Sequence, residues 1–140
     1  MDVAKIDHVK DAAQGAWMTV TDPKTGADMV YTEKDGEVEV TKPVQVLFIG
    51  GDSEEFRRLN QAFKQKQVEL AKRNQWSSQA EDDALRELMS SAARDWRGFT
   101  KEGKPLPFSK SELFDLMGRF PALIEQANNW IGGRANFIKG

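Results

Sequence analysis

Few residues of this chain have the type and spacing that catalysis or metal binding requires. Its single histidine, His8, follows Asp7, and no cysteine or second histidine could complete a zinc site with it. Glu81, Asp82 and Asp83 follow one another where a helix is expected to start, and acidic side chains there favour the helix dipole. Catalytic carboxylates must instead converge across a cleft, which this cluster does not indicate. We therefore expect no catalytic residue, no metal site, no cofactor and no enzymatic activity.

Two glycines before Asp52 and Ser53 are one feature of phosphate-binding loops. The segment nevertheless matches neither GxGxxG nor GxxxxGK[ST]. Glu55 stands three residues after Asp52, as in a capping box. We interpret the segment as the start of a helix, with Asp52 or Ser53 as its N-cap.

A basic stripe follows in the same segment, and it raises the question of a nucleic-acid partner. No aromatic residues interleave with the basic ones in a stacking arrangement, and the net charge of the chain is −2. A solvated face, or a patch for an acidic protein partner, is therefore favoured over nucleic acid. Steep salt dependence of any DNA binding would indicate the nucleic-acid alternative. The basic residues are Arg57, Arg58, Lys64, Lys66, Lys72 and Arg73, opposed after the acidic first turn only by Glu69.

Length and composition limit the architecture that can position these residues. The chain has 140 residues, 39% of them hydrophobic and 30% charged, which is typical of one folded domain. Without cysteine it has no disulfide, so packing alone must hold the fold. No apolar run reaches the roughly 18 residues of a membrane span, and the N-terminus has no apolar signal segment. We expect a protein that is neither secreted nor membrane-bound.

The first third of the chain predicts β-structure. Residues 1–14 are expected to form a flexible arm, and residues 15–140 a single α+β domain whose β-rich part covers residues 15–49. Residues 16–20 and 27–32 flank the turn DPKTG, which indicates a β-hairpin. A second turn, at residues 34–36, precedes two further alternating apolar segments.

The remainder, residues 52–138, predicts about four helices. Apolar residues recur at helical spacing over about residues 52–73, 78–96, 110–120 and the segment after Pro121. Capping boxes starting at Asp52, Ser78 and Ser109 support the first three starts. Trp96 falls on the core-facing side of the second helix, which we expect to form a hairpin with the first.

Four tryptophans are many for a chain of this length, and large aromatic residues that a core cannot enclose are enriched at protein interfaces. Trp76 lies in the turn between two expected helices, and Trp130 lies near the apolar C-terminal segment ANFI. We expect Trp130, Phe137, Ile138 and Trp76 to contact a protein partner. Ordinary core packing is the alternative for Trp130 and Phe137.

Several short motifs follow one another in a characteristic order. In order and spacing they resemble the tail assembly chaperones, and tail-chaperone-like proteins, of tailed phages and prophages. The resemblance covers most of the chain after residue 14. The motifs are GAW from Gly15, DPKTG from Asp22, GGDSEEFRR from Gly50, Trp96, GKPLPFS from Gly103, RFP from Arg119 and RANFI from Arg134.

The resemblance implies a protein that acts during tail assembly in the host bacterial cytoplasm and is absent from the mature virion. Chaperones of this kind bind the long helical tape measure protein, recruit tail tube subunits onto it, and assemble as homo-multimers along it. Repeated weak contacts along a long partner would supply the affinity through avidity. The expected β-hairpin also fits a structural virion component, such as a tail terminator or head-tail connector, which is the alternative function.

Overall fold

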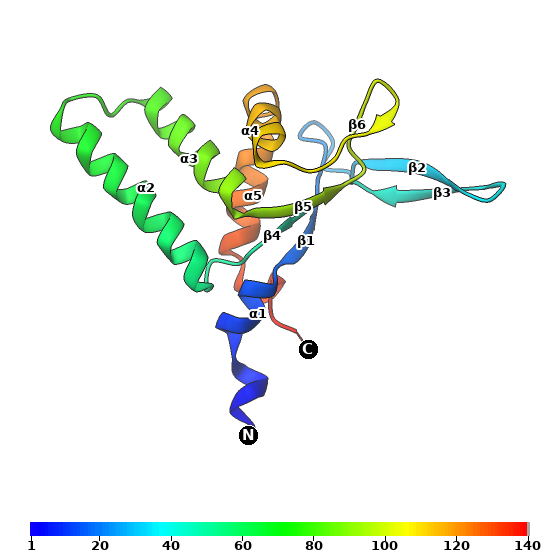
Figure 1. Ribbon diagram of the computed structural model, residues 1–140, viewed down its shortest axis with the longest axis horizontal. Coiled ribbons are helices and arrows are strands. Elements are labelled where there is room, and N and C mark those ends of the chain that lie inside the picture. Colours follow the sequence, from blue (N-terminus) through cyan, green and yellow to red (C-terminus); the bar gives the residue numbers. More distant parts are fainter. Residues whose placement is uncertain (140) are drawn as a thin grey trace.

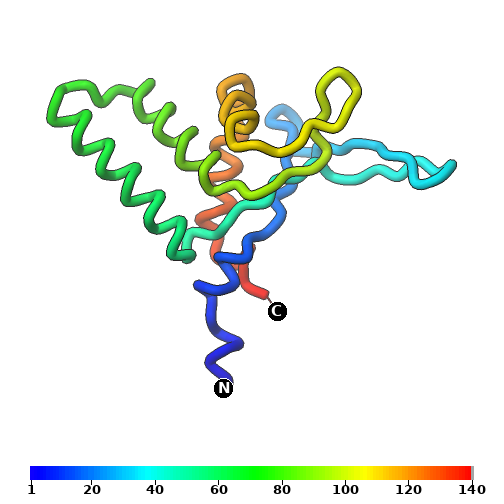
Figure 2. The backbone as a smooth tube through the Cα atoms, viewed as in Figure 1, coloured from blue at the N-terminus to red at the C-terminus, as the bar shows by residue number. Residues whose placement is uncertain are grey.

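The computed structural model describes residues 1–139, which form an α+β fold in which antiparallel strands come first and helices follow. Figures 1 and 2 show a central body from which a helical hairpin and a β-ribbon extend at opposite ends. The fold class predicted from the sequence is confirmed. In chain order the elements are η1 (Val3–Ile6), α1 (His8–Gln14), β1 (Ala16–Thr19), β2 (Val30–Asp35), β3 (Val38–Pro43), β4 (Gln45–Phe48), α2 (Glu54–Lys72), α3 (Ser78–Ala92), β5 (Ala93–Arg97), β6 (Thr100–Lys101), β7 (Lys104–Pro105), α4 (Lys110–Arg119), α5 (Ala122–Gly132) and η2 (Arg134–Asn136).

The body is built on a three-stranded antiparallel sheet with the order β1-β4-β5. Val46 of β4 pairs with Met18 on one side and with Trp96 on the other, and all three side chains are buried. Directly paired residues share one face of a sheet, so this row forms an apolar layer. Helices α4 and α5 cover the layer with fully buried residues such as Leu113 and Leu123.

Serine caps begin three of the helices, as the sequence patterns indicated. The hydroxyl oxygens of Ser53, Ser77 and Ser109 each accept a hydrogen bond of 3.1 Å from the backbone N–H three residues later. Ser53 and Ser109 were expected at these places. Ser77 caps α3 one residue before the Ser78 of the sequence pattern.

The expected helix over residues 78–96 is too long, because the chain leaves the helix after Ala92. Residues 93–97 form strand β5, so Trp96 lies on a strand and not on a helix. The apolar spacing up to Trp96 fits a helix equally well, but pairing with β4 satisfies the backbone of the extended segment. The prediction for Trp96 as a buried residue is confirmed, at 6% exposure.

The expected hairpin around DPKTG is also wrong in its pairing. The turn itself forms, closed by the hydrogen bond from Gly26 N–H to Asp22 O at 2.7 Å. Beyond it the two segments share only the isolated bridge between Thr21 and Asp28. Strand β1 pairs with β4, whereas β2 pairs with β3 through the second turn, where Gly36 has φ +69°.

The segment expected as a loose arm contains helix α1. Asp7 caps it, and Ala12 on its inner face is 2% exposed. A Cβ on Gly50 would lie 3.0 Å from the Cβ of Ala12, so α1 packs directly on the chain before α2. No helix within residues 1–139 is long and apolar enough to cross a membrane.

Candidate protein-binding surface

Residues 96–108 form an aromatic cluster on the sheet edge next to α4. The Trp96 ring lies 4.5 Å from the ring of Phe99 and 5.5 Å from that of Phe108, measured between centroids. Its Nε1–H donates a hydrogen bond of 2.8 Å to the backbone oxygen of Leu106. These contacts hold both ends of an otherwise irregular segment in place.

Between those ends the chain makes the short hairpin β6–β7. Its two-residue loop, Glu102 and Gly103, has φ angles of +54° and +79°, the pattern of a type I′ turn. After the hairpin, the backbone N–H of Leu106 donates a hydrogen bond of 2.9 Å to the backbone oxygen of Phe99. Sequence reasoning missed this hairpin because strands of two residues carry no periodicity.

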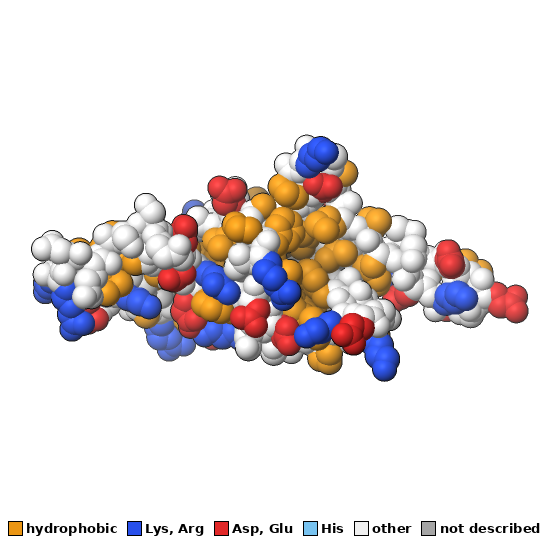
Figure 3. Space-filling model, turned by 90° about the horizontal axis from the view of Figure 1, so that it is seen from above, with side chains coloured by type: hydrophobic (Ala, Val, Ile, Leu, Met, Phe, Trp, Pro, Cys, Tyr) orange, Lys and Arg blue, Asp and Glu red, His pale blue; other side chains and the backbone are white. Residues whose placement is uncertain are grey.

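A groove of about 330 Å³ opens between this hairpin and α4, and we call it the α4 groove. Its apolar floor is half-buried except at Trp96, which is buried, and the charged side chains of Lys101, Glu112 and Arg119 stand at its rim. Figure 3 shows hydrophobic side chains gathered over the middle of the molecule on this side. The floor is formed by Trp96, Phe99, Leu106, Leu116 and Phe120.

Contacts from α3 fix the position of α4 beside the groove. The guanidinium of Arg86 lies 3.8 Å from the ring centroid of Phe114, and its Nε donates to Phe114 O at 2.5 Å. A Cβ on Gly118 would lie 2.6 Å from Nη2 of Arg86, so a larger residue there would displace the guanidinium from its place beside α4. The groove wall is therefore held by specific packing, which lowers the cost of binding a partner.

The α4 groove has the chemistry of a helix-binding surface. An amphipathic helix presents apolar residues at spacings of three and four, and such a stripe can pack on an apolar groove floor. Each Leu- or Ile-sized side chain removed from water contributes roughly 1.5–3 kcal/mol. The rim charges can restrict which helices bind, because a helix with charges opposite to those of the rim is attracted and a helix with like charges is repelled.

The four residues expected to contact a partner lie at two separate places. Trp76, between α2 and α3, packs edge-on against Phe63 with centroids 6.2 Å apart. Trp130 and Phe137 lie together at the base of the body, with centroids 6.1 Å apart. None of the four lines the α4 groove.

Phe137 is a core residue, which was the alternative to its expected contact with a protein partner. Only 3% of its surface is exposed, and a Cβ on Gly50 would lie 2.8 Å from its ring. Ile138, at 41% exposure, and the half-buried Trp130 keep surface that a partner could reach. The RANFI and GGDSEEFRR motifs thus pack on each other, and glycine at position 50 makes the close approach possible.

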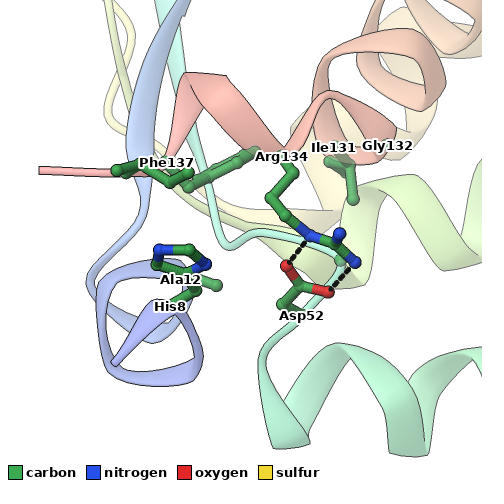
Figure 4. A pocket seen from close by; sticks show the side chains of 9 residues that line it. His8, Ala12, Asp52, Ile131, Gly132, Arg134 and Phe137 are labelled. Atoms are coloured by element: carbon green, nitrogen blue, oxygen red, sulfur yellow. Dashed lines mark hydrogen bonds and ion pairs between the residues drawn. The ribbon is translucent and has the colours of Figure 1, made fainter. Parts of the chain in front are cut away.

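The His8 region forms a small pocket of about 220 Å³ at the same base (Figure 4). Arg134 donates to both carboxylate oxygens of Asp52, from Nε at 2.5 Å and from Nη2 at 3.1 Å. This hydrogen bonding lowers the pKa of Asp52 below its ordinary value of 3.8. The pair ties the C-terminal segment to the start of α2, which the sequence did not reveal.

Metal chemistry finds no support in this pocket. Residues 1–139 contain no group of three or more His, Cys, Asp or Glu side chains that could hold a metal ion. The carboxylate of Asp52 is already bound by Arg134.

Comparison of the chain with protein-family models, with curated proteins and with solved structures finds no match.

Proposed function

We propose that this protein is a tail assembly chaperone of a tailed phage or prophage. In this proposal it binds the tape measure protein, recruits tail tube subunits onto it and leaves before the virion is complete. The host bacterial cytoplasm is the place of action. The order of motifs from Gly15 to Ile138 supports the family, and the α4 groove supports the binding mode.

The observation that carries the proposal is the apolar floor of the α4 groove. Leu116 and Phe120 lie four residues apart on one side of α4, opposite Phe99 and Leu106 from the hairpin side. A tape measure protein is long and helical, so the apolar stripe of one of its helices is the complementary shape. Many weak sites of this kind along one partner would together hold several chaperone copies and still release them to arriving tube subunits.

Co-expression tests the proposal directly. The chain is produced with the tape measure protein and the tail tube protein of the same phage, captured by an affinity tag, and sized by light scattering after size-exclusion chromatography. We expect the tape measure protein to stay soluble in a complex with several copies of this chain. A tape measure protein that precipitates equally with and without this chain would contradict the proposal.

The projecting β2–β3 ribbon favours a second function, that of a structural virion component. An exposed two-stranded ribbon can pair with a neighbouring subunit along its free edges, as permanent ring contacts often do. A tail terminator or a head-tail connector would keep such contacts in the particle. Mass spectrometry of purified virions separates the two functions, since the chaperone is expected to be absent and the structural protein present in a fixed copy number.

A further inference from the structure

The tip of the β2–β3 ribbon is acidic and carries an exposed valine. Val38 is 65% exposed and pairs directly with Asp35, so the two side chains share one face of the ribbon. Glu33 lies on the same face, and Glu37 follows in the turn. Among the acidic side chains of the ribbon, only Glu33 forms an ion pair within residues 1–139, and its partner is Lys42.

The opposite end of the molecule, the outer half of α2, has the reverse charge around another exposed valine. Val68 is 47% exposed, and Lys64 and Lys72 lie one helical turn before and after it on the same stripe. Neither lysine forms an ion pair within residues 1–139. No residue of α2 is fully buried, so this outer stripe is free for a partner.

These two surfaces match each other in chemistry but cannot meet within one molecule. Figure 1 places the ribbon and the α2–α3 hairpin at opposite ends of the body. Figure 3 shows several basic side chains at the helical end, and at the ribbon end acidic side chains with a basic one between them. Contact between two ribbons, or between two α2 stripes, would bring like charges together. Only an acidic end against a basic end combines attraction with burial of both valines.

We propose that a second copy of this chain is the partner of both ends, with the acidic ribbon tip of one copy docked on the Lys64–Val68–Lys72 stripe of the next. Such a contact is heterologous, because the two surfaces differ, so a pair of copies keeps one free ribbon tip and one free stripe. Successive copies therefore form an open chain or a closed ring. The inference concerns the chain alone and holds whether or not it acts in tail assembly.

Charge-reversal variants test this arrangement. Asp35→Lys with Glu37→Lys disables the ribbon end, and Lys64→Glu with Lys72→Glu disables the stripe end; all four side chains are exposed, and circular dichroism checks folding. Sedimentation velocity at low salt is expected to show self-association of the wild type, weakened at least about tenfold in 0.5 M NaCl. Each variant alone is expected to be monomeric.

The mixture of the two variants is the decisive sample. Both ends of one variant are basic and both ends of the other are acidic, so an equimolar mixture is expected to associate into alternating assemblies that contain the two variants in a 1:1 ratio. A chain with all four reversals is expected to self-associate again, because the charges are exchanged and not removed. Lys5→Glu with Lys10→Glu, at two exposed sites near the N-terminus, is the matched control and is expected to behave as the wild type.

Three results would overturn the proposal. The first is a wild type that stays monomeric at low salt up to millimolar concentration. The second is self-association of either end-disabled variant at wild-type strength. The third is a mixture in which the two variants ignore each other, which would indicate a symmetric contact elsewhere.

Discussion

Phe137 offers the sharpest test of the packing at the base of the body. The structure buries its ring between Gly50, Ala12 and Trp130, whereas Ile138 next to it is 41% exposed. Truncation of a buried Phe to Ala removes its transfer free energy and leaves a cavity, at a typical cost of about 3–5 kcal/mol. Because the short segment around η2 can undock locally and relieve part of this cost, we expect about 3 kcal/mol for Phe137→Ala.

Urea denaturation followed by tryptophan fluorescence and far-ultraviolet circular dichroism measures this loss. In a thermal melt, with an unfolding entropy near 2 cal/mol/K per residue, a loss of about 3 kcal/mol of unfolding free energy lowers Tm by about 10 °C. Ile138→Ala is the matched control, and we expect it to lower the free energy of unfolding by less than about 1 kcal/mol. Equal and small effects of both substitutions would refute the buried position of Phe137 and favour its expected contact with a partner instead.

Two further predictions follow from single contacts, and each has its own control. Gly98→Ala should destabilise the fold more than Gly26→Ala. Both glycines have positive φ, but only at Gly98 would an added Cβ meet a ring, at 2.5 Å from Cδ1 of Tyr31. Equal losses of unfolding free energy in urea denaturation would exclude this clash. The Asp52–Arg134 pair should make the fold acid-sensitive, since a carboxyl with a lowered pKa contributes stability above its unfolded pKa and loses it as pH falls through its folded pKa. Below about pH 3.8 the stability of the wild type should thus fall more steeply than that of Asp52→Asn in pH-dependent thermal melts, and identical slopes would show that the pair contributes nothing.

Much of the helical part could be predicted because its signals are local. Ser53 and Ser109 begin their helices through hydrogen bonds to residues three positions away, and the apolar spacing of each helix repeats within a few turns. A sequence read in short windows contains that information. The turn at Asp22–Gly26 was predictable for the same reason.

The strand pairing could not be predicted, because it is set by contacts between distant residues. Strand β5 reads Ala-Arg-Asp-Trp-Arg, which has no β-branched residue and continues the helical spacing of α3. Only its pairing with β4, some fifty residues earlier, makes it a strand. Likewise β1 pairs with β4 across the whole β2–β3 ribbon.

The α4 groove could not be predicted for a related reason. Single aromatic residues near turns and near the C-terminal segment suggested Trp76, Trp130, Phe137 and Ile138, whereas the α4 groove combines residues 96–106 with the outer side of α4. Its floor residues look like core residues in the sequence, and only the packing leaves all of them except Trp96 half-buried. Trp96 and the GKPLPFS motif belong to the family resemblance, but short sequence windows do not show that they come together to form a groove.

The binding of the tape measure protein at the α4 groove is tested most directly by substitutions in the groove during co-expression. Leu116→Glu places a charge on the apolar floor, and Arg119→Glu reverses an exposed rim charge without touching the core. Ile6→Glu is the control, because it makes the same apolar-to-acid change at an exposed site near the N-terminus. The account predicts at least about a tenfold drop in captured tape measure protein for Leu116→Glu, a smaller drop for Arg119→Glu and no change for Ile6→Glu. Capture at the wild-type level by folded Leu116→Glu and Arg119→Glu variants would contradict it.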